Sequence, residues 1–276
     1  ASQASQTRVR KFMSQENRLY RPFEFRTKKS QNIFDLERVA FHYSSDRKFS
    51  LQNLNLGFSP GGWIGLTGPV GSGKSTFLEL LSRQRDPNEG DIYYRGAHLK
   101  SISPEKVAES ILYVPQETFM FSRSIRKNLE LGVETRFPDS ELWQLLKDLS
   151  FDEELLETRG GLDIRLGERG VNLSGGQKQR LSIGRALLRK RDVYLFDDLF
   201  SHVDTETEAK ILRSLEARIP SGATVILVSQ RIATLSRCRD VLVLNANGVE
   251  FFGPPQLAYQ KSPFVQQLQI LQEAAS

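Results

Sequence analysis

The sequence predicts an α/β fold with a mixed sheet, a smaller antiparallel β part and an inserted helical part. Three observations predict this fold. The apolar run of Trp63, Ile64 and Leu66 leads through a glycine-rich loop into a helical pattern that begins near Phe77. Later apolar runs at 111–114, 192–196 and 224–228 alternate with helical patterns, as the parallel strands of βαβ units do. Two runs before residue 60 alternate with a period of two, which is typical of antiparallel strands.

The glycine-rich loop carries the phosphate-binding pattern G-x-x-x-x-G-K-[ST] between a strand and a helix, the context that gives the pattern its meaning. Its glycines let backbone N–H groups approach phosphates, and the helix start adds a partial positive charge. Lys74 is predicted to reach the β- and γ-phosphates, and the Ser75 hydroxyl to bind Mg²⁺. The residues predicted to bind the nucleotide here are Gly68, Pro69, Val70, Gly71, Ser72, Gly73, Lys74, Ser75 and Thr76. A glycine-rich turn without a ligand is the alternative, and the Lys74-Ser75 pair in this context disfavours it.

The first 30 residues differ from the rest. Residues 1–15 are predicted to form an amphipathic helix, and the polar, basic residues 16–31 a linker that contains Pro22. The antiparallel strands are predicted from two sets of alternating apolar residues: Phe34, Leu36, Val39 and Phe41, then Leu51, Leu54, Leu56 and Phe58. Tyr43 follows the first of these strands, where its ring can stack on a flat base or pack as a core aromatic.

The middle of the chain is predicted to be mainly helical from Phe119 to Ser150, with an apolar stripe after Pro138. Ser103 and Pro104 predict an earlier helix start, and Gln116 follows the strand 111–114. In α/β folds ligand-contacting groups lie at such strand ends, although a surface glutamine is the default alternative.

A second helix start follows at Leu173-Ser-Gly-Gly-Gln177, where Ser174 is a plausible N-cap residue. With Gly175, Gly176 and Gln177 it forms a second anion-ready N-terminus. One triphosphate needs one such loop, so this helix start is predicted to serve a nucleotide held by another subunit.

The strand 192–196 ends in Asp197-Asp198, which suits binding of Mg²⁺ through water, while a simple turn is the alternative. Downstream the sequence predicts a helix with Leu212 and Leu215, the strand 224–228, and a hairpin around Asn247-Gly248. A short terminal helix is expected after Pro263.

The composition excludes several classes. A net charge of +5 with dispersed Lys and Arg does not indicate nucleic acid binding. One cysteine, Cys238, excludes an internal disulfide framework, and the three histidines are too dispersed to predict a metal site. The sequence contains no apolar run of 18 residues and no signal peptide is expected, so the polypeptide is predicted to be soluble but able to dock onto a membrane partner.

Over residues 30–260 the chain resembles the ATP-binding domain of ABC transporters, because Leu173–Gln177 is similar to that family's signature motif. The resemblance implies an ABC ATPase fold, a P-loop NTPase core with a helical subdomain at about 115–185 within residues 31–276, and ATP with Mg²⁺ as ligands. It implies that Tyr43 stacks on adenine, that Gln116 contacts Mg²⁺ and the membrane domain, and that Asp197 is the Walker B carboxylate. It also places Asp204 in the D-loop. Catalytic roles are implied for Lys74, Gln116, Asp198 and Gln230, and Mg²⁺ ligation for Ser75, Gln116 and Asp197.

Two positions depart from the family pattern. Asp198 stands where the family usually has Glu, and Gln230 stands where it usually has His. Asp is one methylene shorter, and a displacement of roughly 1 Å can cost about a hundredfold in rate. Gln can hydrogen-bond a phosphate but carries neither proton nor positive charge. We therefore expect a degenerate ATP site in this chain and an intact signature helix that serves a non-identical partner domain.

The segment 167–170 resembles the exporter-type contact with a membrane domain, and residues 1–30 resemble an extension from a last membrane helix. The resemblance thus predicts an exporter domain at the cytoplasmic face of the inner membrane, attached through a membrane domain outside these 276 residues. The partners expected are that membrane domain and a second nucleotide-binding domain, and no nucleic acid. The alternatives are a slow symmetric homodimer, a non-transport ABC ATPase, and a regulatory module that binds ATP without hydrolysing it. Simple P-loop kinases and GTPases lack the Leu173–Gln177 helix start.

Overall fold

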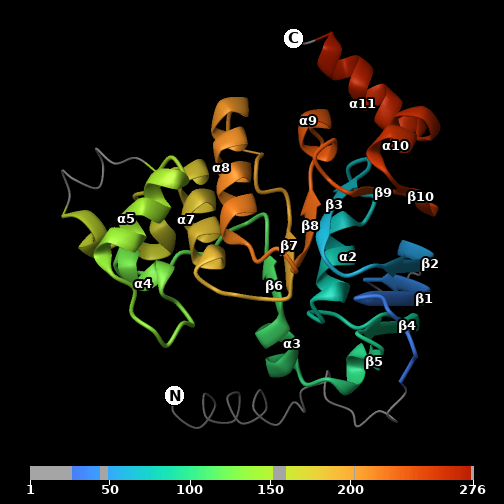
Figure 1. Cartoon of the computed structure of the whole chain (residues 1–276), viewed down its shortest axis with the longest axis horizontal. Helices are drawn as coiled ribbons and strands as arrows, with labels where there is room; N and C mark the ends of the chain where they lie inside the picture. The colour runs from blue at the N-terminus through green and yellow to red at the C-terminus, as the bar shows by residue number, and fades with distance from the viewer. Residues whose placement is uncertain (1–26, 44–48, 152–159, 202, 275–276) are drawn as a thin grey trace, which may run out of the picture.

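The computed structural model describes residues 27–43, 49–151, 160–201 and 203–274, arranged as two sheets with helices between and around them (Figure 1). The antiparallel sheet contains β1 (Phe34–His42), β2 (Phe49–Phe58), β4 (Glu89–Tyr94) and β5 (Ala97–His98) in the order β2-β1-β4-β5. The mixed sheet contains β3 (Gly62–Thr67), β6 (Ile111–Val114), β7 (Val193–Phe196), β8 (Thr224–Val228), β9 (Asp240–Asn245) and β10 (Gly248–Gly253). Its order is β10-β9-β3-β8-β7-β6, parallel except for β10. The predicted α/β fold with a mixed and an antiparallel sheet is confirmed.

Both faces of the mixed sheet are covered, which explains why its strands read as continuous apolar runs. In β8, Ile226 and Val228 pack toward α2 (Lys74–Leu81) and the antiparallel sheet. Val225 and Leu227 pack on the opposite face, toward α7 (Gly175–Leu187) and α8 (Thr205–Arg218). The sheet therefore separates α2 on one face from α7 on the other. The two helix starts that contain glycines, after Gly73 and at Gly175, consequently lie in different parts of the molecule.

The N-caps predicted at Ser103 and Ser174 are confirmed. Ser103 accepts a hydrogen bond from the N–H of Lys106 at the start of α3 (Pro104–Ser110). Ser174 accepts one from the N–H of Gln177, whose side chain accepts from the N–H of Ser174, a complete capping box.

The segment 119–150 is less helical than predicted. It contains α4 (Ile125–Leu129) and α5 (Asp139–Asp148), which together cover less than half of it. The side chain of Asn128 accepts from the N–H of Phe121 at 2.9 Å and donates to its carbonyl at 3.0 Å, so residues before α4 fold back as a loop. Figure 1 shows α4, α5 and α7 gathered on the side of the molecule opposite β1 and β2.

The predicted hairpin turn is shifted by one residue. Gly248 pairs with Asn245, so Ala246 and Asn247 form the turn and Gly248 is the first residue of β10. A Cβ on Gly248 would lie 2.6 Å from the carbonyl oxygen of Gln52. Glycine is needed here because strand β2 passes close by and because φ at this position is +111°, which other residues rarely adopt.

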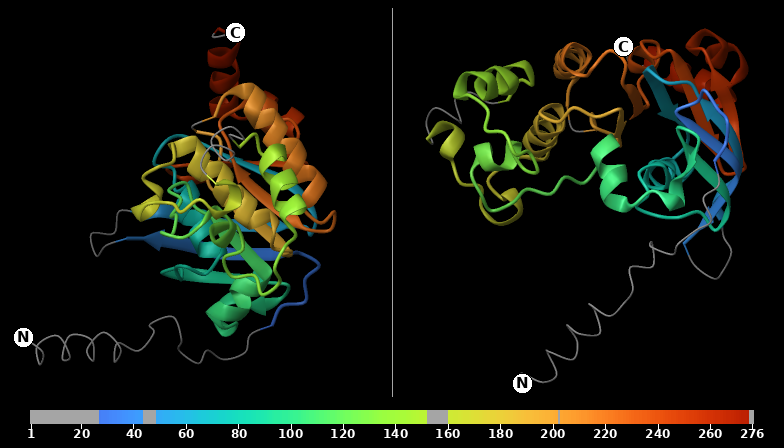
Figure 2. Two further views of the ribbon diagram at one scale, coloured as in Figure 1. Left: turned by 90° about the vertical axis from the view of Figure 1, so that its left-hand side faces the viewer. Right: turned by 60° about the horizontal axis from the view of Figure 1, so that its bottom comes forward.

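The C-terminal part forms a third packed region. Helices α9 (Ile232–Leu235), α10 (Pro255–Lys261) and α11 (Pro263–Glu273) pack with β9, with Val265 and Ala258 fully buried. Figure 2 shows the same helices beside the strand β10 at the end of the molecule that carries the C-terminus. The terminal helix predicted after Pro263 is therefore confirmed.

The N-terminal predictions fall mostly outside the described residues. The proposed amphipathic helix 1–15 and most of the linker 16–31 cannot be compared with the structure. The end of that linker pairs with the antiparallel sheet, because the N–H of Lys28 donates to the carbonyl of Gly96 at 2.7 Å. Three short 3-10 helices complete the described elements: η1 (Leu99–Ser101), η2 (Gly161–Asp163) and η3 (Glu168–Gly170). Within the described ranges, no helix combines the length and the apolar character that a membrane crossing requires.

Candidate functional site

The glycine-rich loop 68–73 joins β3 to α2, and its glycines are required by its path. Gly68 has φ +143°, and a Cβ there would lie 2.0 Å from the carbonyl oxygen of Leu244. Gly71 has φ +80° and open space within 4 Å of where its Cβ would stand. Gly73, with φ +88°, is the N-cap of α2 and provides no capping side chain. The first N–H groups of α2 therefore face outward, as an anion-binding helix start requires.

Lys74 lies across this loop. Its Nζ donates to the carbonyl oxygens of Gly68 and Pro69, each at 2.8 Å. Burial lowers the pKa of Lys74, and attraction by Asp197 and Asp198 opposes that shift. The ammonium group is thus held at the mouth of the loop, close to two carboxylates.

Asp197 follows β7 directly and is 3% exposed. Its Oδ2 accepts a hydrogen bond from the hydroxyl of Tyr113 at 3.1 Å, and its carboxylate also bonds the Ser75 hydroxyl. Burial raises the pKa of Asp197, while these two hydrogen bonds and the charge of Lys74 oppose the rise. Two hydroxyl groups from two different elements therefore fix the orientation of this carboxylate.

Gln116 and Asp198 come together from neighbouring strand ends. The Nε2 of Gln116 donates to Oδ2 of Asp198 at 2.9 Å. Asp198 has φ +49°, a left-handed conformation. Residues other than glycine rarely adopt it, but Asp and Asn do so more often than most. One carboxylate oxygen of Asp198 is therefore bonded to the Gln116 amide, and Asp198 lines the same cavity as Lys74.

A cavity of about 540 Å³ connects these groups with the loop after β8. Its lining consists of the P-loop, the two strand ends and the segment 228–231, with these residues: Val70, Gly71, Lys74, Ser75, Gln116, Asp197, Asp198, Phe200, Ser201, Val228, Ser229, Gln230 and Arg231. The structure thus brings Lys74, Ser75, Gln116, Asp197, Asp198 and Gln230, predicted from distant parts of the sequence, to one cavity.

Arg231 connects the cavity to α8. Its guanidinium donates to the carbonyl of Val203 at 2.7 Å and pairs with the carboxylate of Glu208, which is 3% exposed. The hydroxyl of Thr234 bonds the same carboxylate. Burial raises the pKa of Glu208, and the bond from Thr234 and the charge of Arg231 oppose the rise. Asp204, next to Val203, caps α8 through the N–H and hydroxyl of Thr207, which lower the pKa of Asp204 to about 2.

Several predicted site residues lie outside the cavity lining: five from the P-loop segment (Gly68, Pro69, Ser72, Gly73 and Thr76), Tyr43, and the helix start 174–177. Tyr43 is 56% exposed, and its hydroxyl lies 2.6 Å from Oγ1 of Thr76 while the guanidinium of Arg85 sits 4.8 Å from its ring centre. Tyr43 is therefore attached to α2 but presents its ring beside the cavity. The helix start 174–177 does not line the cavity, and Ser174 and Gly175 are exposed.

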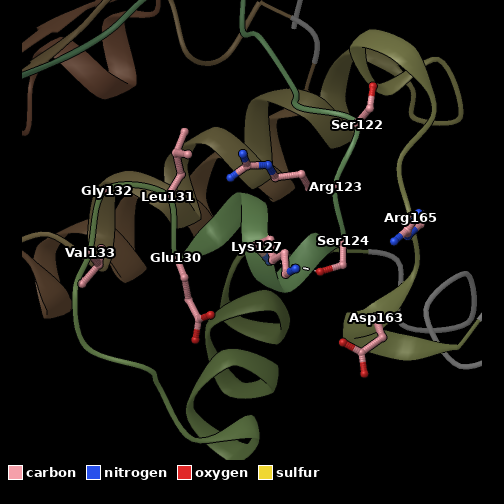
Figure 3. A pocket seen from close by; sticks show the side chains of 10 residues that line it. All are labelled: Ser122, Arg123, Ser124, Lys127, Glu130, Leu131, Gly132, Val133, Asp163 and Arg165. Atoms are coloured by element: carbon pink, nitrogen blue, oxygen red, sulfur yellow. Dashed lines mark hydrogen bonds between the residues drawn. The ribbon is translucent and has the colours of Figure 1, made fainter.

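A larger, more open hollow of about 770 Å³ lies around α4 (Figure 3). Arg123, Lys127 and Glu130 line it from one side, and Asp163 and Arg165 from the other. An isolated antiparallel bridge joins Ser124 and Arg165, which both line this hollow. It holds none of the residues predicted to bind nucleotide, so its position is compatible with a partner surface but not with the P-loop chemistry.

The residues of the first cavity fit a magnesium nucleoside triphosphate. Ser75, Asp197 and Gln116 offer hydroxyl, carboxylate and amide oxygens, which are the ligands that Mg²⁺ prefers. The buried hydroxyl of Ser72 has no hydrogen-bond partner at the base of the loop, as in a cradle built for a ligand. Lys74 supplies the cation that a triphosphate requires.

Sequence reasoning missed three groups that support the cavity. Tyr113 was available as an aromatic two residues before Pro115, but its bond to Asp197 depends on the parallel pairing of β6 and β7. Arg231 directly follows Gln230, which is a weak signal. The side chain of Gln272, on α11, bonds the loop after β8 that contains Gln230, and nothing in the sequence around Gln272 indicates this contact.

The loop, the lysine and the strand-end carboxylates together define a P-loop nucleotide-binding domain. The chain belongs to the ABC transporter family, whose model matches residues 51–201. It is 36% identical over 220 residues to the uncharacterized ABC transporter ATP-binding protein YwjA of Bacillus subtilis (strain 168), covering 80% of this chain and 38% of that protein. It is 32% identical over 253 residues to YheI of the same organism, a probable multidrug resistance ABC transporter ATP-binding/permease protein, covering 92% of this chain and 43% of that protein.

A solved structure is also similar. A bacterial Atm1-family ABC exporter with ATP bound matches with a TM-score of 0.86 and 26% identity, covering 96% of this chain and 47% of that one. The ABC ATPase fold predicted from the sequence is therefore confirmed, and the solved relative is described as an exporter. The chain spans less than half the length of these relatives.

Proposed function

We propose that this chain is the ATP-binding domain of an ABC exporter, that it binds MgATP, pairs with a second such domain, and couples ATP hydrolysis to export of a substrate. The observation that carries the proposal is the convergence of Lys74, Ser75, Asp197 and Gln116 on one cavity. In this proposal Lys74 binds the β- and γ-phosphates, and the P-loop N–H groups hold the rest of the triphosphate. Ser75, Asp197 and Gln116 hold Mg²⁺, which supplies charge neutralisation of the phosphate oxygens.

The chain's own site has low hydrolytic activity in this proposal. Asp198 stands at the position of the general base for the attacking water, and one of its two carboxylate oxygens, Oδ2, accepts a hydrogen bond from Gln116 at 2.9 Å. Asp198 is also one methylene shorter than Glu, so it reaches less far toward the phosphate from a backbone with φ +49°. Gln230 at the cavity wall can donate a hydrogen bond but cannot add charge.

The signature helix serves the nucleotide of a partner domain. Ser174 caps α7 and stands exposed with Gly175 at the surface, outside the cavity lining. A phosphate placed there would receive N–H dipoles from α7, while its own P-loop would come from the other polypeptide. A non-identical partner with Glu and His at the positions of Asp198 and Gln230 fits this asymmetry. The partner's active P-loop site would then combine with the intact signature helix of this chain. Tyr43, beside the cavity, stacks on the adenine.

The membrane domain docks on the side of Gln116. The segment after Gln116 leads directly into the hollow around α4, where Arg123 and Lys127 lie open to a partner (Figure 3). In the proposed exporter, residues 1–30 extend from the membrane domain and residues 31–276 form the nucleotide-binding domain, with its helical subdomain at about 115–185. This places the domain at the cytoplasmic face of the cell membrane. The alternative is a regulatory module that binds ATP without cleaving it, and the departures from the family pattern at Asp198 and Gln230 are compatible with it.

The test compares ATP binding and turnover in the unmodified chain and in the double variant Asp198→Glu, Gln230→His. We expect both to bind MgATP with similar affinity, and the double variant to hydrolyse it on the order of a hundredfold faster. Turnover by the unmodified chain near the ~10 s⁻¹ that is typical of enzymes would contradict the low-activity site. If the double variant also fails in single-turnover hydrolysis, the regulatory module becomes the better reading. Failure of both to bind ATP contradicts the proposal as a whole.

A further inference from the structure

The loop Ser229–Ile232, called here the switch loop, carries Gln230 into the cavity between β8 and α9. Its first half is held by the body of the domain. The N–H of Ser229 donates to the carbonyl of Leu66 at 3.1 Å, beside the P-loop, and the hydroxyl of Ser229 accepts from the N–H of Arg231 at 3.0 Å. These contacts leave the carbonyl of Gln230 and the N–H of Ile232 to be satisfied by another element.

The side chain of Gln272, near the end of α11, bonds both groups. Its Nε2 donates to the carbonyl oxygen of Gln230 at 2.6 Å, and its Oε1 accepts from the N–H of Ile232 at 3.0 Å. A primary amide can donate and accept in this way, much as a backbone peptide group does. Ile232 is the first residue of α9, whose N-cap Arg231 provides no side-chain cap, so Gln272 supplies the missing cap from 40 residues away.

The first half of α11, the helix that carries Gln272, packs against the domain. Val265 of α11 is fully buried against Leu235, Val241 and Val243, and the α11 N-cap Ser262 is also fully buried. The hydroxyl of Ser262 donates to Glu250 of β10 at 2.5 Å. Figure 1 shows α11 leaving α10 at the top of the molecule on the side where α9 lies. Gln272 of this helix therefore holds the two peptide groups on either side of Arg231, and the first of them directly follows Gln230.

We propose that Gln272 is a positioning residue for Gln230, so that the C-terminal helix sets where this side chain meets the γ-phosphate. The inference rests on the proposed function of the cavity. Gln272 itself lies outside the cavity lining and outside the residues matched by the family model, and it acts through the backbone of the switch loop. Because Gln230 would contact the γ-phosphate, loss of the clamp weakens binding of ATP and leaves binding of ADP unchanged.

The experiment uses Gln272→Met, which keeps length and helix propensity but removes both hydrogen bonds. Its matched control is Gln269→Met on the same helix, because Gln269 bonds Glu273 within α11 instead of the switch loop. Hydrogen exchange of the peptide segment 229–235 is measured without nucleotide, and MgATP and MgADP affinities are measured by titration. We expect Gln272→Met to speed exchange of the Ile232 amide by about tenfold, the equivalent of one to two ordinary hydrogen bonds. We expect ATP affinity to fall about threefold to tenfold with ADP affinity unchanged, and Gln269→Met to behave as the unmodified chain.

A third variant, Gln272→Glu, separates the two bonds. Its carboxylate still accepts from the N–H of Ile232 but places an acceptor against the carbonyl of Gln230, so exchange at Ile232 stays slow while ATP affinity falls as in Gln272→Met. Unchanged exchange in Gln272→Met, or an equal loss of ATP and ADP affinity, overturns the inference. Absence of nucleotide binding in the unmodified chain would instead contradict the proposed function, and the exchange measurement would still report on the clamp.

Discussion

Two helix starts with glycines, those of α2 and α7, differ in what surrounds them. The first begins after Gly73 without a capping side chain, at the wall of a cavity that also holds Lys74 and two aspartates. The second begins after Ser174 with a complete capping box and stands at the surface. The helix dipole is common to both, so it does not distinguish them.

The difference lies in the charges and in the cap. Beside the start of α2, Lys74 donates to the carbonyl of Gly68 at 2.8 Å and Asp197 accepts from the hydroxyl of Tyr113 at 3.1 Å, so one chain gathers cation, anion and hydroxyl groups at this site. At α7 the capping box stabilises the helix without any ligand. We infer that α2 forms a binding site by itself, while α7 becomes one when another polypeptide brings a phosphate to it.

The largest effect is expected at Lys74. Replacing it in Lys74→Met removes the cation and both bonds to the loop carbonyls while keeping a similar length. Because charge-assisted hydrogen bonds contribute about 1.5–3 kcal/mol each, ATP affinity should fall by roughly a hundredfold. Titration of a fluorescent ATP analogue measures this.

The matched control for Lys74 is Lys100→Met. Lys100 also donates to a carbonyl, that of Pro87 at 3.3 Å, but lies outside the cavity lining. It should bind ATP as the unmodified chain does. Equal affinities for the two variants would show that the α2 helix start alone carries binding, and the contrast with α7 would lose its basis.

A smaller effect is expected at Tyr113. Tyr113→Phe removes the hydroxyl that donates to Asp197 at 3.1 Å and leaves the ring in its packing. The carboxylate then has Ser75 as its remaining hydroxyl partner among those described above, so Mg²⁺ should be needed at about tenfold higher concentration for half-maximal ATP binding. Nucleotide binding in EDTA should not change.

The control for this prediction is Tyr94→Phe. The Tyr94 hydroxyl donates to Asp192 at 3.4 Å in the same core but away from the cavity, so this variant carries the same loss of a hydroxyl. A shift in Mg²⁺ dependence in both variants, or in neither, would remove Tyr113 from the account of the site.

The comparison also shows which features a sequence alone can reveal. Strands such as Thr224–Val228 and caps such as Ser103 were predicted, because apolar period and capping chemistry are local properties. The sequence predicts helix before α4, whereas the structure has a loop there, because the path of that loop depends on the side chain of Asn128, which bonds the backbone of Phe121 seven residues away. The bond of Gln272 to the switch loop could not be predicted either, because it joins residues 42 positions apart and forms only when α11 packs against the domain. Six predicted residues, Lys74, Ser75, Gln116, Asp197, Asp198 and Gln230, line one cavity, while Tyr43 and the helix start 174–177 lie outside it. The residues that support the cavity were not predicted.

The smallest effect, and the one that separates the two helix starts, is expected at Ser174. Ser174→Ala removes the α7 N-cap, which should lower the free energy of unfolding by about 1 kcal/mol, and Ser103→Ala, the matched loss of the α3 cap, should cost a similar amount. At low chain concentration, where the chain is a monomer, neither variant should change ATP affinity. At high concentration, two domains that each contact the other's ATP associate, and this association raises the apparent affinity for ATP by mass action. This increase in apparent ATP affinity should persist in Ser103→Ala and should be about fivefold smaller in Ser174→Ala. Weaker ATP binding by Ser174→Ala at low concentration would instead mean that α7 serves the nucleotide of its own chain.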